Sequence, residues 1–243
     1  MSKAIILMYH NIAISPKGAR IPNLYVTPRM FRYQMWHLQA AGFKVLSVQD
    51  LLTAVATGDM THNMAALTFD DGYQDFYFNA YPVLRQHGYP STVYVVSGLV
   101  GKDNNWDDRN EMVKKPLMDW KMIEEVSRNG VQIGSHSRTH PQLSILSQEA
   151  LREELRGSRE ELESRLGIPI DQFCYPYGDQ TVRVRDEVKN AGYRYAVTTQ
   201  RGHVEKGFDP VAVRRIPIKL ITNPFSFSFK IHTDSEKRKG GQE

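Results

Sequence analysis

The chain has 243 residues, of which 41% are hydrophobic and 24% are charged, an ordinary globular composition with enough apolar side chains for a large core. Lys and Arg outnumber Asp and Glu by 31 to 27, and part of the excess of +4 lies at residues 237–239, so no basic stripe indicates a nucleic acid partner. The single cysteine, Cys174, excludes an internal disulfide.

Apolar runs bounded by turn residues predict strands, and apolar residues at helical spacing between them predict helices. The strands are expected at residues 5–9, 44–46, 64–69, 91–96, 131–134, 172–175, 193–198 and 213–218. The helices are expected at residues 28–41, 48–57, 76–87, 117–128, 147–166 and 181–191. Strands therefore alternate with helices, and no linker or repeat divides the chain. This pattern predicts one α/β domain over residues 1–232, with a mostly parallel sheet that is open or closed into a barrel.

Three further segments carry expectations of their own. Residues 99–117 are polar and long for a structureless connection, which favours a functional loop. The many Glu and Arg residues of the helix at 147–166 are expected to form a solvated face. Residues 233–243 are expected to be a disordered tail. No apolar run reaches the length of a membrane span.

Asp70 and Asp71 follow an apolar strand directly and precede Gly72, which ends it. Functional groups in α/β proteins commonly lie where a strand stops. Two carboxylates so close are stable together only if a cation or a proton separates them. The pair therefore indicates a metal, a shared proton or both; the alternative is an ordinary Asp-Asp-Gly turn.

His136 and His140 are four residues apart and follow another short apolar strand. Two imidazoles at that spacing can share a metal, although His pairs without one are commoner. With one of the two aspartates they supply three ligands and leave a position open, the arrangement of a catalytic zinc site. The other aspartate is then available to accept a proton.

These motifs, at residues 68–72 and 136–140, resemble the first two motifs of the polysaccharide deacetylases, the NodB-homology or carbohydrate esterase family 4 enzymes. Residues 173–178, Phe-Cys-Tyr-Pro-Tyr-Gly, resemble the third motif. The resemblance implies a distorted (β/α) barrel that removes acetyl groups from N-acetylated sugars with a metal, expected to be Zn²⁺. It implies that the metal ligands are Asp71, His136 and His140. It makes Asp70 the general base.

The resemblance also implies a substrate-binding role for the third motif. Tyr177 would lie beside the substrate, with its backbone N–H helping to bind the oxyanion, and Pro176 would lie next to it. Sugar rings need flat apolar surfaces beside hydrogen-bonding groups, for which Trp106, Tyr175 and Tyr177 are candidates. Trp106 is about equally expected to pack under its own loop.

Two positions depart from the family pattern. Cys174 stands where the third motif usually has an arginine that orients the catalytic aspartate. Arg214 or Arg215 could replace it, or nothing does, and Cys174 itself is expected to be a small buried residue.

The late Leu-x-His motif of the family, which supplies the general acid, has no convincing match. Met8-Tyr9-His10 instead resembles the subgroup that deacetylates poly-N-acetylglucosamine in biofilms, in which the acid-bearing strand comes first. His10 is therefore expected to be the general acid; the alternative is a structural histidine at a strand end.

The resulting hypothesis is a metal-dependent N-deacetylase of a sugar polymer or oligomer, with a carbohydrate partner, no nucleic acid and no membrane span. The alternatives are a related hydrolase of another C–N bond in a small molecule and an inactive carbohydrate-binding protein. The start of the chain does not resemble a signal peptide, which predicts a cytoplasmic protein, or an extracellular or cell-envelope one if a leader has been removed.

Overall fold

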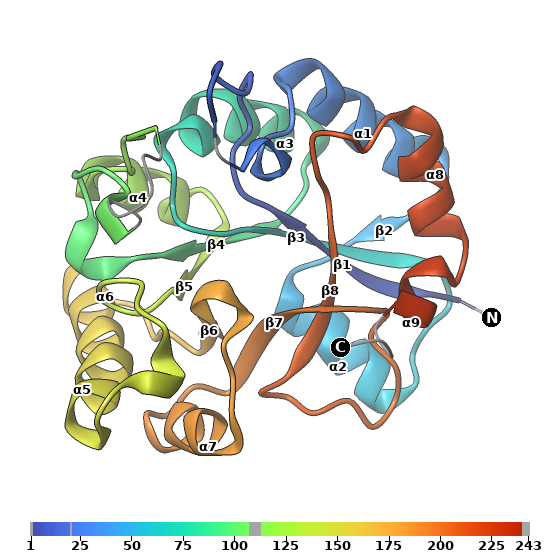
Figure 1. The fold of residues 1–243 in the computed structure, drawn as a ribbon. Coiled ribbons are helices and arrows are strands. Elements are labelled where there is room, and N and C mark those ends of the chain that lie inside the picture. The colour runs from blue at the N-terminus through green and yellow to red at the C-terminus, as the bar shows by residue number, and fades with distance from the viewer. Residues whose placement is uncertain (1, 20, 107–112, 240–243) are drawn as a thin grey trace.

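The computed structural model describes residues 2–19, 21–106 and 113–239 of the chain. Within these residues, eight parallel strands alternate with helices (Figure 1). The strands are β1 (Ala4–Tyr9), β2 (Lys44–Val45), β3 (Met64–Phe69), β4 (Ser91–Val95), β5 (Val131–Ser135), β6 (Gln172–Cys174), β7 (Tyr195–Arg201) and β8 (Val213–Pro217). Each was predicted from its apolar run, with bounds that differ by at most three residues.

The sheet closes into a barrel because β1 pairs with β8 on one side and with β3 on the other. Seven strands form the ring, in the order β1-β8-β7-β6-β5-β4-β3. β2 is an additional strand that pairs with the start of β3 at Met64, while β4 pairs with the end of β3 at Thr68. The expected barrel is therefore confirmed, and the alternative of an open sheet is wrong.

The helices lie around the outside of the sheet in Figure 1. They are α1 (Pro28–Ala40), α2 (Val48–Thr57), α3 (Tyr81–His87), α4 (Trp120–Arg128), α5 (Gln148–Arg152), α6 (Ser158–Leu166), α7 (Val182–Asn190), α8 (Pro224–His232) and α9 (Ser235–Lys239). Side chains of Thr27, Ser47 and Thr181 accept hydrogen bonds from backbone N–H groups at the starts of α1, α2 and α7, as N-cap residues do. No helix in the described part of the chain combines the length and the apolar character that crossing a bilayer requires.

Three predicted helices are modified. The helix expected at 76–87 begins with a π-helical segment, Phe76–Ala80, before α3. The helix expected at 117–128 begins at Trp120, because Leu117 forms a bridge with Tyr73 and the Met118 N–H donates to the Gly72 carbonyl. The extended segment thus supports the turn after β3. The helix at 147–166 contains a π-helical segment, Glu153–Gly157, between α5 and α6.

The expected disorder after residue 232 is wrong for residues 235–239, which form α9. Glu236 of α9 is buried and pairs with Arg201 and Lys230, which explains the order: three charged groups satisfy one another. The polar residues 233–243 do not reveal from sequence alone that Glu236 has a charged partner as distant along the chain as Arg201. Residues 240–243 of the tail, and residues 107–112 of the loop expected to be functional, lie outside the described residues.

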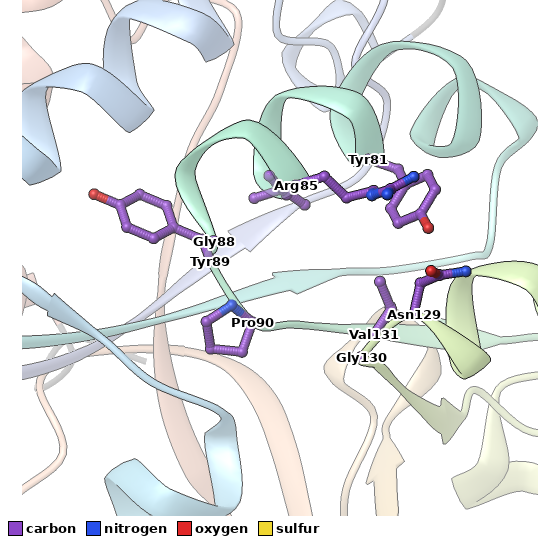
Figure 2. Close-up of a pocket in the computed structure, with 9 residues that line it drawn as sticks. Tyr81, Arg85, Gly88, Tyr89, Pro90, Asn129, Gly130 and Val131 are labelled. Carbon is purple, nitrogen blue, oxygen red and sulfur yellow. The ribbon is translucent and has the colours of Figure 1, made fainter.

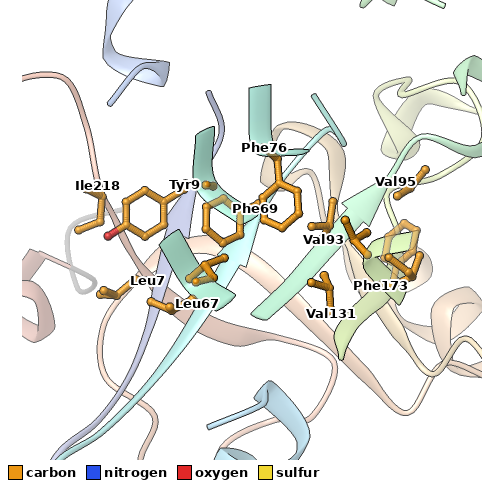
Figure 3. Packing of buried hydrophobic residues seen from close by; sticks show 14 of the residues in the cluster. Leu7, Tyr9, Leu67, Phe69, Phe76, Val93, Val95, Val131, Phe173 and Ile218 are labelled. Carbon is orange, nitrogen blue, oxygen red and sulfur yellow. The ribbon is translucent and has the colours of Figure 1, made fainter. Parts of the chain in front are cut away.

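Alternate strand residues face opposite sides of the barrel wall. Leu7 and Tyr9 on β1 and Leu67 and Phe69 on β3 pack outward in the main hydrophobic cluster under the helices (Figure 3). The alternating residues of the same strands face the interior of the barrel. There, Ile6, Ala66, Tyr94 and Cys174 form a second cluster with α2. This alternation decides which residue at each strand end points toward the mouth of the barrel.

Candidate active site

The predicted site residues meet at one end of the barrel, where the carboxyl ends of the parallel strands lie. His10 follows β1, the aspartates follow β3 and His136 follows β5. They line a pocket of about 410 Å³. Its other lining residues are Met8, Ile21, Leu24, Tyr73, Trp106, His140, Tyr175, Tyr177, Thr199, Arg201, Pro217 and Lys219.

Asp71, His136 and His140 form a compact buried group. Asp71 Oδ1 lies 3.2 Å from His136 Nε2 and 3.5 Å from His140 Nε2, and one donor atom of each residue lies within 4.8 Å of the others. His136 Nδ1 bonds the carbonyl oxygen of Cys174 at 2.7 Å, which places a proton on Nδ1 and directs Nε2 toward Asp71. This donor set fits a divalent metal held by two imidazoles and a carboxylate.

The charges of this group favour a cation. Burial alone raises the pKa of Asp71, but hydrogen bonds from His136 and His140 hold it well below its usual range. Burial alone lowers the pKa of His136, yet the neighbouring Cys174 and Asp71 raise it well above the ordinary value. A carboxylate that stays ionised while buried needs a nearby positive charge, which a bound metal would also supply.

The backbone at the site is strained. Asp71, Ser137 and His140 all have left-handed φ angles, of 75°, 63° and 62°, a conformation that costs a non-glycine residue about 1–3 kcal/mol. The Ser137 hydroxyl accepts a hydrogen bond from the His140 N–H at 3.0 Å, and the Ser137 N–H donates to Ser135 Oγ at 3.2 Å. These hydrogen bonds hold a turn between His136 and His140. The two histidines, four residues apart, therefore lie on a turn and not on a helix.

Glu154, in the π-helical segment, binds the outside of the same turn. Its carboxylate accepts hydrogen bonds from the N–H groups of Arg138 and Thr139, each at 2.9 Å, and from the Thr139 hydroxyl at 2.6 Å. The prediction that the charges of helix 147–166 only form a solvated face is therefore wrong for Glu154. A π-helical turn often marks a functional position, and here it places this carboxylate beside the histidine turn.

Asp70 has a different partner, Arg215 on β8. Arg215 Nη1 and Nη2 donate to the two carboxylate oxygens of Asp70, both at 2.7 Å. Its remaining N–H groups donate to Thr198 O at 2.9 Å, Thr68 Oγ1 at 3.0 Å and Cys174 Sγ at 3.2 Å. All five donors of this fully buried guanidinium are thus satisfied.

Of the two arginines expected as replacements for the one absent at Cys174, Arg215 is the one that binds Asp70. Arg214, the other candidate, is exposed, because neighbouring residues of β8 face opposite sides. Burial alone raises the pKa of Asp70, and Arg215 lowers it below the usual range, so Arg215 both fixes this carboxylate and favours its ionised form.

Cys174 is fully buried, as expected. Asp70, His136 and Cys174 also come close enough to hold a metal, but two observations disfavour that set. Both oxygens of Asp70 bind Arg215, and burial raises the pKa of the Cys174 thiol, whereas a metal binds the thiolate.

His10 lies on the other side of Asp70. Its Nε2 is 3.8 Å from Asp70 Oδ2, and its side chain is partly exposed to the pocket. The imidazole thus lies beside the Asp70 carboxylate and faces the pocket.

The predicted substrate-binding residues differ in exposure. Trp106 and Tyr177 flank His140, with ring centroids 4.5 and 4.6 Å from its imidazole, and Tyr177 is 47% exposed. Tyr175 lines the pocket but is 1% exposed, and its hydroxyl donates to the Val211 carbonyl, so its ring supports the wall and offers no stacking face. Pro176 is buried and is not among the lining residues.

Sequence reasoning missed several pocket residues. Arg201 ends β7 and Lys219 follows β8, and their only sequence signal is that place at a strand end. Ile21 and Leu24 come from a loop with no motif.

A second hollow lies at the opposite end of the barrel, where β4 and β5 begin (Figure 2). Tyr81, Arg85, Pro90 and Asn129 are among its lining residues. That lining contains no carboxylate, histidine or cysteine. The groups that could perform hydrolysis are therefore at the other end.

A closed parallel barrel with a buried Asp-His-His group, beside a second carboxylate fixed by arginine, defines a metal-dependent hydrolase. The profile of the family described as "Polysaccharide deacetylase" matches residues 57–196, more than half of the chain. The chain belongs to this family.

Individual relatives agree with this assignment. The chain is 25% identical over 246 residues to the poly-beta-1,6-N-acetyl-D-glucosamine N-deacetylase of Staphylococcus epidermidis, covering 91% of this chain and 80% of that one. The Streptococcus pyogenes deacetylase PplD, solved in complex with acetate, superimposes with a TM-score of 0.82 at 25% identity, over 95% of this chain and 99% of that one. A polysaccharide deacetylase from Bacillus cereus gives 0.76 at 29% identity, over 95% and 69%. The resemblance to the polysaccharide deacetylases is therefore confirmed.

Proposed function

We propose that this protein removes N-acetyl groups from an N-acetylated amino sugar in a polymer or oligomer, using a Zn²⁺ ion held by Asp71, His136 and His140. The observation that carries the proposal is the division of the two adjacent aspartates: one lies against two imidazoles and the other against an arginine. Such a pair provides a metal ligand and a proton acceptor within one site.

The reaction is the hydrolysis of an amide. Asp71, His136 and His140 would hold the metal, which would polarise the acetyl carbonyl and lower the pKa of a bound water. Asp70, held ionised by Arg215, accepts the proton as water attacks the carbonyl carbon. The backbone N–H of Tyr177 helps to bind the developing oxyanion. His10, protonated, donates a proton to the leaving nitrogen as the C–N bond breaks, which leaves acetate and a free amine.

The pocket wall is suited to a sugar. Trp106 and Tyr177 present aromatic surface on either side of His140, and aromatic faces bind the apolar face of a sugar ring. The name of the staphylococcal relative makes oligomers of β-1,6-linked N-acetylglucosamine the first substrate class to test.

The test is amine release from N-acetylglucosamine oligomers by the purified protein, with a chelator and after addition of Zn²⁺. We expect release that disappears with the chelator and returns with Zn²⁺. Return with another divalent ion but not with Zn²⁺ would change the metal assignment. Binding without release under every metal condition would favour a carbohydrate-binding protein, and release only from small-molecule amides would favour a different hydrolase.

A further inference from the structure

The two sides of the pocket differ in charge. One side is built from uncharged side chains, namely Ile21, Leu24, Tyr73, Trp106 and Tyr177. The other side, at the ends of β7 and β8, presents Arg201 and Lys219. Asp70 and Asp71 are the only carboxylates among the lining residues of the described chain, and both already have partners, Arg215 for Asp70 and His136 for Asp71.

Arg201 is paired with a buried carboxylate of α9. Its Nε and Nη2 lie 2.7 and 2.6 Å from Oε2 of Glu236 on α9. The same buried carboxylate pairs through Oε1 with Lys230 Nζ at 3.0 Å. The two oxygens of one buried carboxylate thus bind two different cations. The contact also fixes Arg201 in place at the pocket wall.

Lys219 adds a second positive charge. Its backbone N–H donates to Thr222 Oγ1 at 2.9 Å, which fixes the main chain independently of the side chain. The residue is half-buried and lines the pocket. Over the described ranges 2–19, 21–106 and 113–239, no carboxylate lies within 4.0 Å of its ammonium group.

A neutral sugar gives no reason for this arrangement. Removing an ammonium group from water is unfavourable unless an opposite charge compensates it, and the pocket would desolvate Lys219 further when a substrate fills it. An anionic group on the substrate would supply the missing charge, and Arg or Lys side chains bind phosphate and carboxylate by charge-assisted hydrogen bonds.

We propose that Arg201 and Lys219 form a subsite for an oxyanion, a phosphate or a carboxylate, carried by the substrate beside the acetylated amino sugar. The inference rests on the proposed deacetylase function and narrows its substrate class to acidic amino-sugar polymers or oligomers. The aromatic side of the pocket receives the sugar ring, and the cationic side receives its acidic substituent.

The test compares wild type with Lys219→Met, which removes the charge and keeps most of the apolar stem. The substrates are three N-acetylglucosamine oligomers of equal length: neutral, bearing a lactyl carboxylate, and bearing a phosphate monoester. We expect wild type to have a kcat/KM about tenfold higher for at least one acidic oligomer. Lys219→Met should lose this preference, with a KM for the preferred acidic oligomer that rises more than the KM for the neutral one. The acidic oligomer that responds identifies the oxyanion.

Lys121→Met, at an exposed position of α4 outside the pocket, is the matched control and should keep the preference. Equal kcat/KM for neutral and acidic oligomers in wild type, or a preference that survives Lys219→Met, would overturn the subsite. Calorimetric binding of the acidic oligomers to the zinc-loaded proteins separates the two proposals. Absence of amine release from every oligomer would refute the deacetylase function, whereas equal binding by wild type and Lys219→Met would refute the subsite.

Discussion

Asp70 and Asp71 are neighbours in the sequence, yet they belong to two different parts of the molecule. Asp71 turns through a left-handed backbone toward His136 and His140, which come from one short motif. Asp70 points into the barrel and binds Arg215, 145 residues further along the chain. The comparison shows how two identical side chains acquire different surroundings: Asp71 lies against two imidazole nitrogens, and Asp70 is fixed by a guanidinium.

The largest effect should come from removing the histidines beside Asp71. His136→Ala/His140→Ala should lose stoichiometric metal, and amine release should fall to background, because one carboxylate does not hold a divalent ion alone. Metal analysis of the purified variant checks this, with His62→Ala, an exposed histidine, as control. Full retention of metal would show that the ligands lie elsewhere.

The role proposed for Asp70 is tested by Asp70→Asn. The variant should keep its metal but lose about 10²–10⁴-fold in kcat, because it lacks a proton acceptor. Metal content and turnover are measured on the same preparation. Loss of the metal together with activity would mean that the two aspartates share one role.

His10→Ala should keep the fold and the metal and lose about 10²-fold on an N-acetyl substrate. The loss should be smaller on a matched O-acetyl substrate, whose leaving oxygen needs less protonation. The measurement is turnover of both substrates by the variant. Small, equal losses on the two would make His10 a structural residue.

Arg215→Met should change the pH dependence. Burial alone raises the pKa of Asp70 and Arg215 lowers it, so without Arg215 the pKa rises. Asp70 then becomes protonated, and activity falls, at a pH where wild type is still active. We expect the acid limb of the kcat/KM profile to move to higher pH. At a pH on this limb, kcat/KM of the variant should be about tenfold lower than that of wild type.

Arg214→Met, at the exposed neighbouring position, is the control and should leave the profile in place. Because removing one partner of a buried ion pair also costs about 3–5 kcal/mol of stability, the profile is measured on protein shown to be folded by circular dichroism. An unmoved acid limb would mean that Arg215 does not set the ionisation of Asp70.

The smallest effect is expected at Glu154. Glu154→Ala removes three hydrogen bonds to the histidine turn and should weaken metal affinity about tenfold, as loss of groups that orient ligands commonly does. Glu154→Gln, which keeps acceptor oxygen, should restore part of it. Competition with a chelator measures the affinity. Glu160→Ala, a substitution at an exposed position of α6, is the control. An equal loss of metal affinity in this variant would show that Glu154 has no specific role at the site.

The two halves of the site also differ in how much the sequence revealed. The strands and the metal-binding half follow from local patterns: an apolar run, then a motif of a few residues. Arg215 could be named only as one of two candidates, because its role depends on which face of β8 it occupies and on the space beside Cys174. The cationic side of the pocket was missed for a similar reason, since Arg201 is held by Glu236 of a helix that a polar sequence did not predict.

The separation between Asp70 and Arg215 has a consequence for synthesis of the protein. A ribosome adds about 5–20 residues per second, so the Asp70 carboxylate exists for roughly 7–30 s before its guanidinium partner has been made. β1 cannot complete its pairing with β8 during this interval either. His136 and His140 are translated well before Arg215, so a nascent chain contains the whole Asp71-His136-His140 group while Asp70 still lacks its guanidinium partner. The barrel and the ion pair of Asp70 can therefore be completed only after β8 has left the ribosome.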